Sequence, residues 1–169
     1  MWRPGSGLWR CSLLRCRSGG GLCLAMSFMS AIVFVDTNIL VYAHDADAGE
    51  KRDRAIGKLR QLWENDTGRL SVQVLQEFYV NVTRKLATRV ARSTAREIVS
   101  AYGAWVREPT TAETVLRATD IAELVQISFW DALIVAAAEQ VGAEQLLSED
   151  LNDGQEIAGV RIVNPLVVA

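Results

Sequence analysis

The feature that most constrains the fold is a short apolar run, residues 31–35, that ends at an acidic residue. The run is rich in β-branched and aromatic residues, which favours a strand buried on both faces, as in a parallel sheet. Asp36 follows directly, and Thr37 and Asn38 are residue types that begin helices. Asp36 is therefore predicted at a switch from strand to helix, at the edge of an open α/β sheet where ligands bind.

Helical and strand patterns alternate through the rest of the chain. Helices are predicted over about 46–66, 73–86, 94–106, 111–125 and 128–141, and short strands near 69–72, 145–148 and 160–163. Strands that alternate with helices predict an α/β fold, with a parallel sheet of four to five strands and helices on both faces.

Two helix starts are predicted from capping patterns. Thr94 with Glu97 has the spacing of a capping box, and Ser128 with Asp131 fits an N-cap followed by an acid at the third helical position. Residues 132–138 are apolar on all sides of the second of these helices, so that helix is expected to be central and buried.

Residues 1–30 differ from the rest of the chain in composition. They contain four arginines, no acid and all three cysteines, without a sustained helical or strand period. We interpret them as an unstructured N-terminal extension, and we favour an early translation start over a targeting segment. The folded domain is assigned to residues 31–169.

Charge and cysteine content limit the functional classes. The formal net charge is −2, so no global basic field indicates a nucleic-acid binder. No cysteine follows residue 30, which excludes a disulfide framework or a thiolate metal site in the domain and predicts a reducing, cytoplasmic setting. No stretch approaches the roughly 20 apolar residues that a membrane span needs, so no membrane association is expected.

Three acids are expected to meet at one edge of the sheet. Asp36 and Asp150 follow apolar strands, Asp131 begins the buried helix, and strand ends of a parallel sheet converge. Carboxylates placed close together repel one another, and only two basic residues follow Arg107. A hard cation such as Mg²⁺ or Mn²⁺ is the simplest neutraliser; zinc is disfavoured because the chain has a single histidine.

Each of these acids also has a purely structural interpretation. Asp131 could be a capping acid, and Asp150 and Asp153 could be turn residues. Periodicity places Glu77 opposite the main apolar stripe of its helix, which favours a solvated glutamate. His44, at the end of a helix, is expected at the surface.

Four sequence blocks, taken together, resemble a known family. They are FVDTNILVYAHD, VQVLQEF, SFWDALIVAAA and LLSEDLNDG, followed by GVRIVNP, and they span residues 31–166 in order. They resemble the PIN domain in its VapC-type toxin form. The resemblance implies a Rossmann-like sheet, a Mg²⁺- or Mn²⁺-dependent ribonuclease, a cognate antitoxin that occludes the groove, and commonly a homodimer.

The resemblance also implies roles for individual residues. The acids that would hold the metal and carry catalysis are Asp36, Glu77, Asp131 and Asp150. Thr37, Asn38 and Ser148 would be supporting residues that orient ligands or water, and Asp153 matches a more variable secondary acid. The implied reaction is attack on an RNA phosphodiester by a water molecule that one or two bound cations activate.

Local basic patches would have to hold the RNA against an acidic site. Lys51, Arg54 and Lys58 share one helical face, and a second group lies between Arg84 and Arg96. Two other classes of protein are alternatives to this family. A phosphoacceptor or haloacid-dehalogenase-like domain needs a late lysine or a substitute arginine, and no lysine follows Lys85. A non-catalytic PIN-fold module held by a protein partner is the second alternative.

Overall fold

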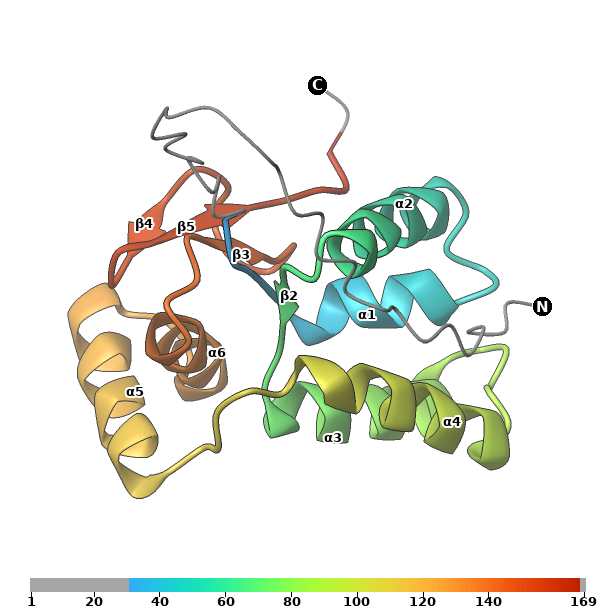
Figure 1. Cartoon of the computed structure of the whole chain (residues 1–169), viewed down its shortest axis with the longest axis horizontal. Coiled ribbons are helices and arrows are strands. Elements are labelled where there is room, and N and C mark those ends of the chain that lie inside the picture. Colours follow the sequence, from blue (N-terminus) through green and yellow to red (C-terminus); the bar gives the residue numbers. More distant parts are fainter. Residues whose placement is uncertain (1–30, 168–169) are drawn as a thin grey trace, which may run out of the picture.

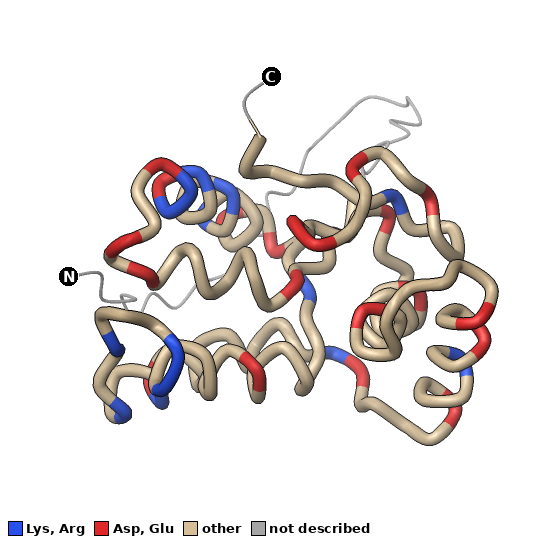
Figure 2. The backbone as a smooth tube through the Cα atoms, turned by 180° about the vertical axis from the view of Figure 1, so that it is seen from behind, with Lys and Arg blue, Asp and Glu red and all other residues tan. Residues whose placement is uncertain are grey.

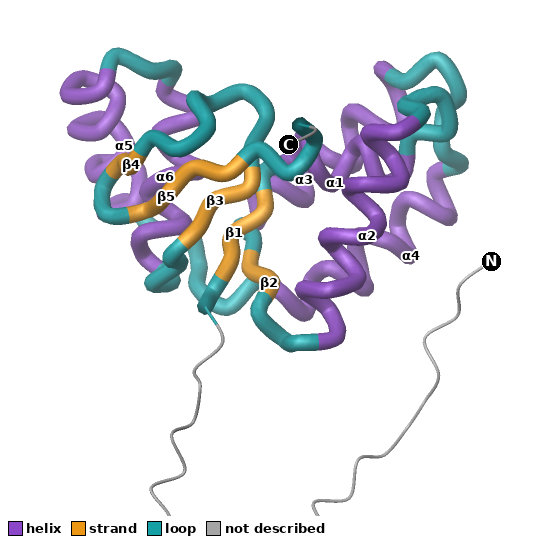
Figure 3. Tube along the Cα trace, turned by 90° about the horizontal axis from the view of Figure 1, so that it is seen from above, coloured by secondary structure: helices purple, strands orange, loops and turns teal. Residues whose placement is uncertain are grey.

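A five-stranded sheet forms the centre of the computed structural model, which describes residues 31–167 (Figures 1 and 3). The spatial order of the strands is β2-β1-β3-β5-β4. All neighbours pair in parallel except β4, which runs antiparallel to β5 at the edge of the sheet. The strands are β1 (Val33–Val35), β2 (Gly68–Arg69), β3 (Gln145–Leu147), β4 (Glu156–Ile157) and β5 (Val160–Val163).

Helices lie on both sides of this sheet, as predicted. Figure 3 shows α5 and α6 on one side and α1 to α4 on the other. The helices are α1 (Thr37–His44), α2 (Glu50–Glu64), α3 (Val72–Val80), α4 (Arg92–Tyr102), α5 (Ala112–Val125) and α6 (Phe129–Gln140). A π-helical turn, Asn81–Lys85, extends α3, and a 3-10 turn, Gly103–Trp105, follows α4. The two-residue β4 is the one strand that the sequence pattern did not predict.

The centre of the sheet and the helix behind it are buried as expected. Phe34 and Val35 of β1 are fully buried, and all seven residues of the apolar segment 132–138 in α6 are buried. Asp36 is the N-cap of α1, which confirms the predicted switch from strand to helix. Because Val35 pairs with Leu147 in the parallel register, Asp36 and Ser148 leave the sheet side by side.

One of the two predicted helix starts is correct. Ser128 is the N-cap of α6, and its hydroxyl accepts a hydrogen bond from the Asp131 amide at 3.1 Å. The Thr94 prediction is wrong, because α4 already begins at Arg92. The Ala91 carbonyl accepts the first helical bond, from the Ala95 amide, and fully buried Ala95 fixes that turn against the core.

An aromatic layer fills the space between α1, α2, α3 and α4, and it contains His44. The imidazole lies edge-on to the rings of Phe78 and Tyr102, at centroid distances of 5.4 and 6.1 Å. Trp63 and Trp105 continue the layer, with ring centroids 5.2 Å apart. The prediction of a surface histidine is therefore wrong. His44 is buried because α4, which comes much later in the sequence, packs over the end of α1.

The structure does not test the predicted N-terminal extension, and it bears on the prediction about membrane spans only for the described residues. Residues 1–30, interpreted above as an extension, lie outside the described residues. Among residues 31–167, no single helix is long and apolar enough to cross a membrane. Only α5 and α6 taken together reach that length and composition, and they are bent by 118° where they meet.

Candidate functional site

One cavity of about 330 Å³ lies beyond the carboxyl ends of the parallel strands, and four acidic side chains line it. They come from four separate parts of the fold: Asp36 from the end of β1, Glu77 from α3, Asp131 from the first turn of α6, and Asp150 from the loop after β3. These are the four acids that the family resemblance implied. Thr37 and Asn38 also line the cavity.

Asp36 is the most buried of the four acids, with 7% of its surface exposed. Its carboxylate accepts hydrogen bonds from the Thr37 amide at 2.6 Å and the Ser148 hydroxyl at 2.8 Å. Burial raises the pKa of Asp36 to about 7; the hydrogen bonds from Ser148 and Thr37 oppose this rise, and the charges of Asp150 and Asp131 add to it. The negative charges of Asp131 and Asp150 therefore reach the Asp36 carboxylate.

Asn38 and Ser148 join Asp36 to Asp150. The Asn38 amide nitrogen donates to the Asp36 carboxylate at 3.1 Å and to the Asp150 carboxylate at 2.9 Å. Ser148 is fully buried, and its hydroxyl also accepts a hydrogen bond from the Asp150 amide at 3.1 Å. Two neutral side chains thus hold two acids at the same edge of the sheet.

Glu77 is held inside the cavity, so the interpretation as a solvated glutamate is wrong. Its two carboxylate oxygens accept hydrogen bonds from the Thr37 hydroxyl at 2.9 Å and the Gln73 amide at 2.8 Å. The Gln73 amide also lies 3.3 Å from the Trp130 carbonyl oxygen, which links α3 to α6. Sequence reasoning missed Gln73; its spacing of four residues from Glu77 on one helix was the available signal.

Asp131 combines the structural and the functional interpretation. Its amide is capped by Ser128, whose hydroxyl in turn donates to the Asp131 carboxylate at 2.7 Å. The same side chain lines the cavity. Capping therefore explains where Asp131 lies without removing it from the site.

Asp153, by contrast, does not line the cavity. Its carboxylate accepts a hydrogen bond from the Asn164 amide at 2.8 Å, and so fastens the chain that leaves β5. Asp153 thus makes a structural contact of the kind expected for a turn residue. It has no direct contact with the other acids that would support its predicted secondary role.

The donor set of the cavity fits a hard divalent cation in its chemistry. The carboxylates accept hydrogen bonds from hydroxyl and amide groups, and no ion pair with Lys or Arg involves any of these four acids in the described chain. The side-chain oxygen of Asn38 is buried and has no hydrogen-bond partner in the described part of the chain. Oxygen ligands are those that Mg²⁺ and Mn²⁺ prefer.

The side chains stand apart, however. Within residues 31–167, no group of three or more His, Cys, Asp or Glu side chains is gathered tightly enough to hold a metal ion. The acids accept hydrogen bonds from neutral donors instead, such as Gln73 for Glu77, Ser128 for Asp131, and Asn38 for both Asp36 and Asp150. Coordination of one ion by three or more of these side chains therefore needs them closer together than they lie here.

The two predicted basic patches differ. Lys51 and Arg54 of the first patch are partly exposed but make contacts within the domain, Lys51 with Glu149 and Arg54 with Glu50 and the Leu166 carbonyl. In the second patch every cation is exposed and makes no ion pair with a described residue. This basic cluster lies around the turn between α3 and α4 (Figure 2) and consists of Arg84, Lys85, Arg89, Arg92 and Arg96.

The structure thus defines a class of protein: an α/β domain with an acid-lined cavity at the carboxyl edge of a parallel sheet. The PIN domain family model matches residues 33–157. The chain belongs to the PIN domain family, as its sequence blocks predicted. No relative was found among curated proteins.

Solved structures share the fold. VapBC2 from Rickettsia felis, bound to a DNA fragment from its promoter, is 21% identical with a TM-score of 0.55, over 78% of this chain and 96% of that one. A toxin–antitoxin complex from Klebsiella pneumoniae is 20% identical with a TM-score of 0.58, over 80% and 99%. VapC20 from Mycobacterium tuberculosis, a sarcin–ricin loop cleaving toxin, is 22% identical with a TM-score of 0.50, over 68% and 86%.

Proposed function

We propose that this protein is a VapC-type toxin that hydrolyses RNA phosphodiester bonds in the presence of Mg²⁺ or Mn²⁺. One observation carries the proposal: four carboxylates from distant parts of the chain line one cavity, and the groups that hold them are neutral. Their mutual repulsion is best relieved by a bound cation. The family, and the VapC toxins among proteins of the same fold, support the choice of RNA as substrate.

Asp36, Glu77, Asp131 and Asp150 are the residues that would hold the ion. When bound, Mg²⁺ or Mn²⁺ supplies positive charge for the scissile phosphate and lowers the pKa of water. The protein's own contribution is orientation. Thr37 and Gln73 fix the two oxygens of Glu77, and Ser148 fixes Asp36. Such supporting hydrogen bonds keep ligand side chains in position and change metal affinity about 10- to 100-fold when they are removed.

The basic cluster between α3 and α4 is the part of the surface that we assign to the RNA backbone. Its exposed arginines carry charge that no described acid neutralises in an ion pair, and α3 also carries Glu77. Affinity for RNA should fall steeply with salt, and the double variant Arg89→Ala with Arg92→Ala should reduce the slope of log affinity against log salt by roughly 1 to 2. A slope that does not change excludes these two arginines from phosphate binding.

The decisive experiment is RNA cleavage with added Mn²⁺ or Mg²⁺. Asp36→Asn and Asp131→Asn should each lower the rate by roughly 100-fold or more, because each removes a charged oxygen ligand. The matched control is Asp120→Asn, which changes an exposed acid on α5 and should cleave like the wild type. Undiminished cleavage in both cavity variants would remove the mechanism.

Metal binding distinguishes the alternative function, a non-catalytic PIN-fold module, from the proposed ribonuclease. A titration of the metal-free protein with Mn²⁺, followed by calorimetry, should show binding below millimolar concentration in the wild type and weaker binding in Asp36→Asn. Absence of binding and of cleavage together would favour the inert module.

We also propose that a cognate antitoxin is the protein partner and that this chain forms a homodimer. The protein is proposed to act in the cytoplasm. Two solved complexes with the same fold are VapBC2 and a toxin–antitoxin complex.

An exposed apolar rim borders the cavity, formed by Val80 of α3 and by Trp130, which is 62% exposed. Light scattering of the isolated protein should give twice the mass of one chain, and Val80→Glu should shift it toward the monomer. A monomeric wild type would contradict the homodimer.

A further inference from the structure

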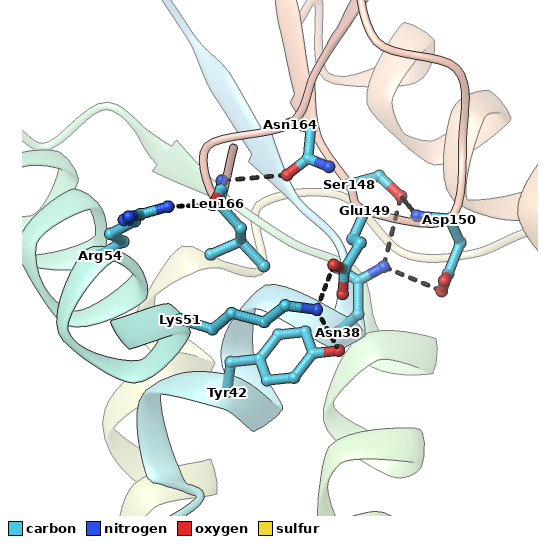
Figure 4. A network of polar contacts seen from close by, with 9 residues as sticks. All are labelled: Asn38, Tyr42, Lys51, Arg54, Ser148, Glu149, Asp150, Asn164 and Leu166. Atoms are coloured by element: carbon cyan, nitrogen blue, oxygen red, sulfur yellow. Dashed lines mark hydrogen bonds and ion pairs between the residues drawn. The ribbon is translucent and has the colours of Figure 1, made fainter. Parts of the chain in front are cut away.

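The loop after β3 carries two neighbouring acids that face different partners (Figure 4). Asp150 lines the cavity, and its carboxylate accepts from Asn38 at 2.9 Å. Glu149 does not line the cavity, and its carboxylate forms an ion pair with Lys51 of α2. The backbone between these two side chains is therefore held from both sides.

Helix α1 supports both of these contacts. Asn38 and Tyr42 are four residues apart on α1 and so lie on one face of the helix. The Lys51 ammonium donates to the Tyr42 hydroxyl at 3.4 Å and lies 4.8 Å from the centroid of the Tyr42 ring. Tyr42 thus restricts the end of a long, otherwise mobile side chain, which lowers the entropy cost of the ion pair with Glu149.

Helix α2 also holds the chain segment that follows β5. Arg54, three residues after Lys51, donates to the Leu166 carbonyl. The Leu166 amide donates to the Asn164 side chain at 2.9 Å, and the Asn164 amide donates to Asp153 at 2.8 Å. The loop that carries Asp150 is therefore anchored to α2 at both of its ends, through Glu149 and through Asp153.

Charge gives Lys51 a second effect on the site. Glu149 is adjacent to Asp150, and a free carboxylate there would add to the repulsion among the acids of the cavity. Lys51 is the cation that contacts this loop in the described chain. Its ammonium neutralises Glu149 while leaving Asp150 available.

We propose that Lys51 is a positioning residue, which holds Glu149 so that the loop after β3 presents Asp150 to Asn38 and the acid-lined cavity. The consequence for metal binding rests on the proposed function. The consequence for the loop itself does not, because the contact of Lys51 with Glu149 involves no bound ion.

The first test measures the loop in the metal-free protein. The Asp150 amide donates to the Ser148 hydroxyl, so its hydrogen exchange reports whether the loop is held. Lys51→Met keeps an apolar chain of similar length but removes the charge, and should speed exchange of this amide roughly threefold to tenfold. Lys51→Arg keeps the charge and should exchange like the wild type.

A matched control lies on the same helix. Arg60→Met removes an exposed cation of α2 that makes no contact with the loop, and should leave exchange of the Asp150 amide unchanged. The proposal is overturned if Lys51→Met leaves this exchange unchanged, or if Lys51→Arg exchanges as fast as Lys51→Met.

The second test measures Mn²⁺ affinity in the same variants. Lys51→Met should weaken binding several-fold, whereas Lys51→Arg and Arg60→Met should bind like the wild type. If the wild type binds no Mn²⁺, the proposed function fails, and the exchange experiment still decides the role of Lys51.

Discussion

The two ends of α1 each carry a largely buried ionisable side chain, and the surroundings of the two differ in kind. At the first end, burial raises the pKa of Asp36 to about 7, yet a hydroxyl and two amides donate to its carboxylate. At the last residue, burial lowers the pKa of His44 to about 4, with a smaller contribution from Arg52, and the imidazole Nε2 has no hydrogen-bond partner among residues 31–167. Both groups are disfavoured in their charged form, but only Asp36 is surrounded by groups that suit a charge.

This difference shows what distinguishes a site from a core. Burial shifts the pKa of any ionisable group, so a shifted pKa alone does not identify chemistry. Hydrogen-bond donors directed at a buried carboxylate favour its charged form, whereas an apolar environment favours the neutral form of any group. By this comparison the cavity around Asp36 is the candidate functional site, and the aromatic layer around His44 is packing.

The largest effect separates two neighbours on α3. Phe78 is fully buried in the aromatic layer beside His44, whereas Glu77 lines the cavity. Phe78→Ala should cost about 3–5 kcal/mol of unfolding free energy, because it leaves a hole in a packed core. Glu77→Ala should cost less than about 1 kcal/mol. Urea unfolding of both variants measures this, and equal losses would contradict the distinction between site and core.

The next effect concerns His44 and acid. Its folded-state pKa lies below the unfolded value of 6.5, so below pH 6.5 the unfolded chain takes up a proton that the folded chain refuses. Stability should therefore fall by up to about 3 kcal/mol as the pH drops from 6.5 to 4. His44→Phe keeps an aromatic ring in the layer and should remove this part of the pH dependence. Parallel stability curves for the two proteins across that window would contradict the prediction.

The pH dependence at Asp36 has the opposite sign, and the substitution that tests it should have a smaller effect on stability. Its folded-state pKa lies above 3.8, so the unfolded chain loses its proton first, and stability falls as the pH rises from about 4 to about 7. Without metal, Asp36→Asn should be roughly 1–2 kcal/mol more stable than the wild type at pH 8, since relief of desolvation exceeds the weakened hydrogen bonds. At pH 4 the gain should vanish. Chemical unfolding in the presence of a chelator measures both values, and a gain independent of pH would count against burial as the cause.

The smallest effect compares two helix caps. Ser128 caps α6 and donates to Asp131, whereas Ser71 caps α3 without a donation to an acid. Ser128→Ala and Ser71→Ala should each cost about 1 kcal/mol. Only Ser128→Ala should also change the affinity for Mn²⁺, because it frees the Asp131 carboxylate. Thermal unfolding and metal titration measure the two quantities, and equal metal affinities would assign Ser128 to capping alone.

Local patterns were sufficient for the parts of the fold that local chemistry determines. The apolar run before Asp36 predicted β1 and its switch to α1, and the spacing from Ser128 to Asp131 predicted the start of α6. The four cavity acids followed from motif resemblance, and strand-end geometry alone pointed to three of them.

Contacts between distant segments were beyond such patterns. Periodicity placed Glu77 in solvent, because it reports the main stripe of a helix and not a second face covered by Thr37. His44 is buried by α4, which lies about fifty residues further along the chain. Lys51 read as part of an open basic face, and nothing near it in sequence indicates Glu149 as its partner.

The strand order has a consequence for how the protein is made. β1, formed by the earliest described residues, pairs with β3 across more than a hundred residues, and the hydrogen bond between Asp36 and Ser148 spans 112 positions. Contacts of such long sequence separation form late and slowly. A chain still emerging from the ribosome, with Ser148 and Asp150 not yet synthesised, therefore holds only part of the acid set. The acid-lined cavity is therefore complete only after Ser148 and Asp150 have been synthesised and have reached Asp36 and Asn38.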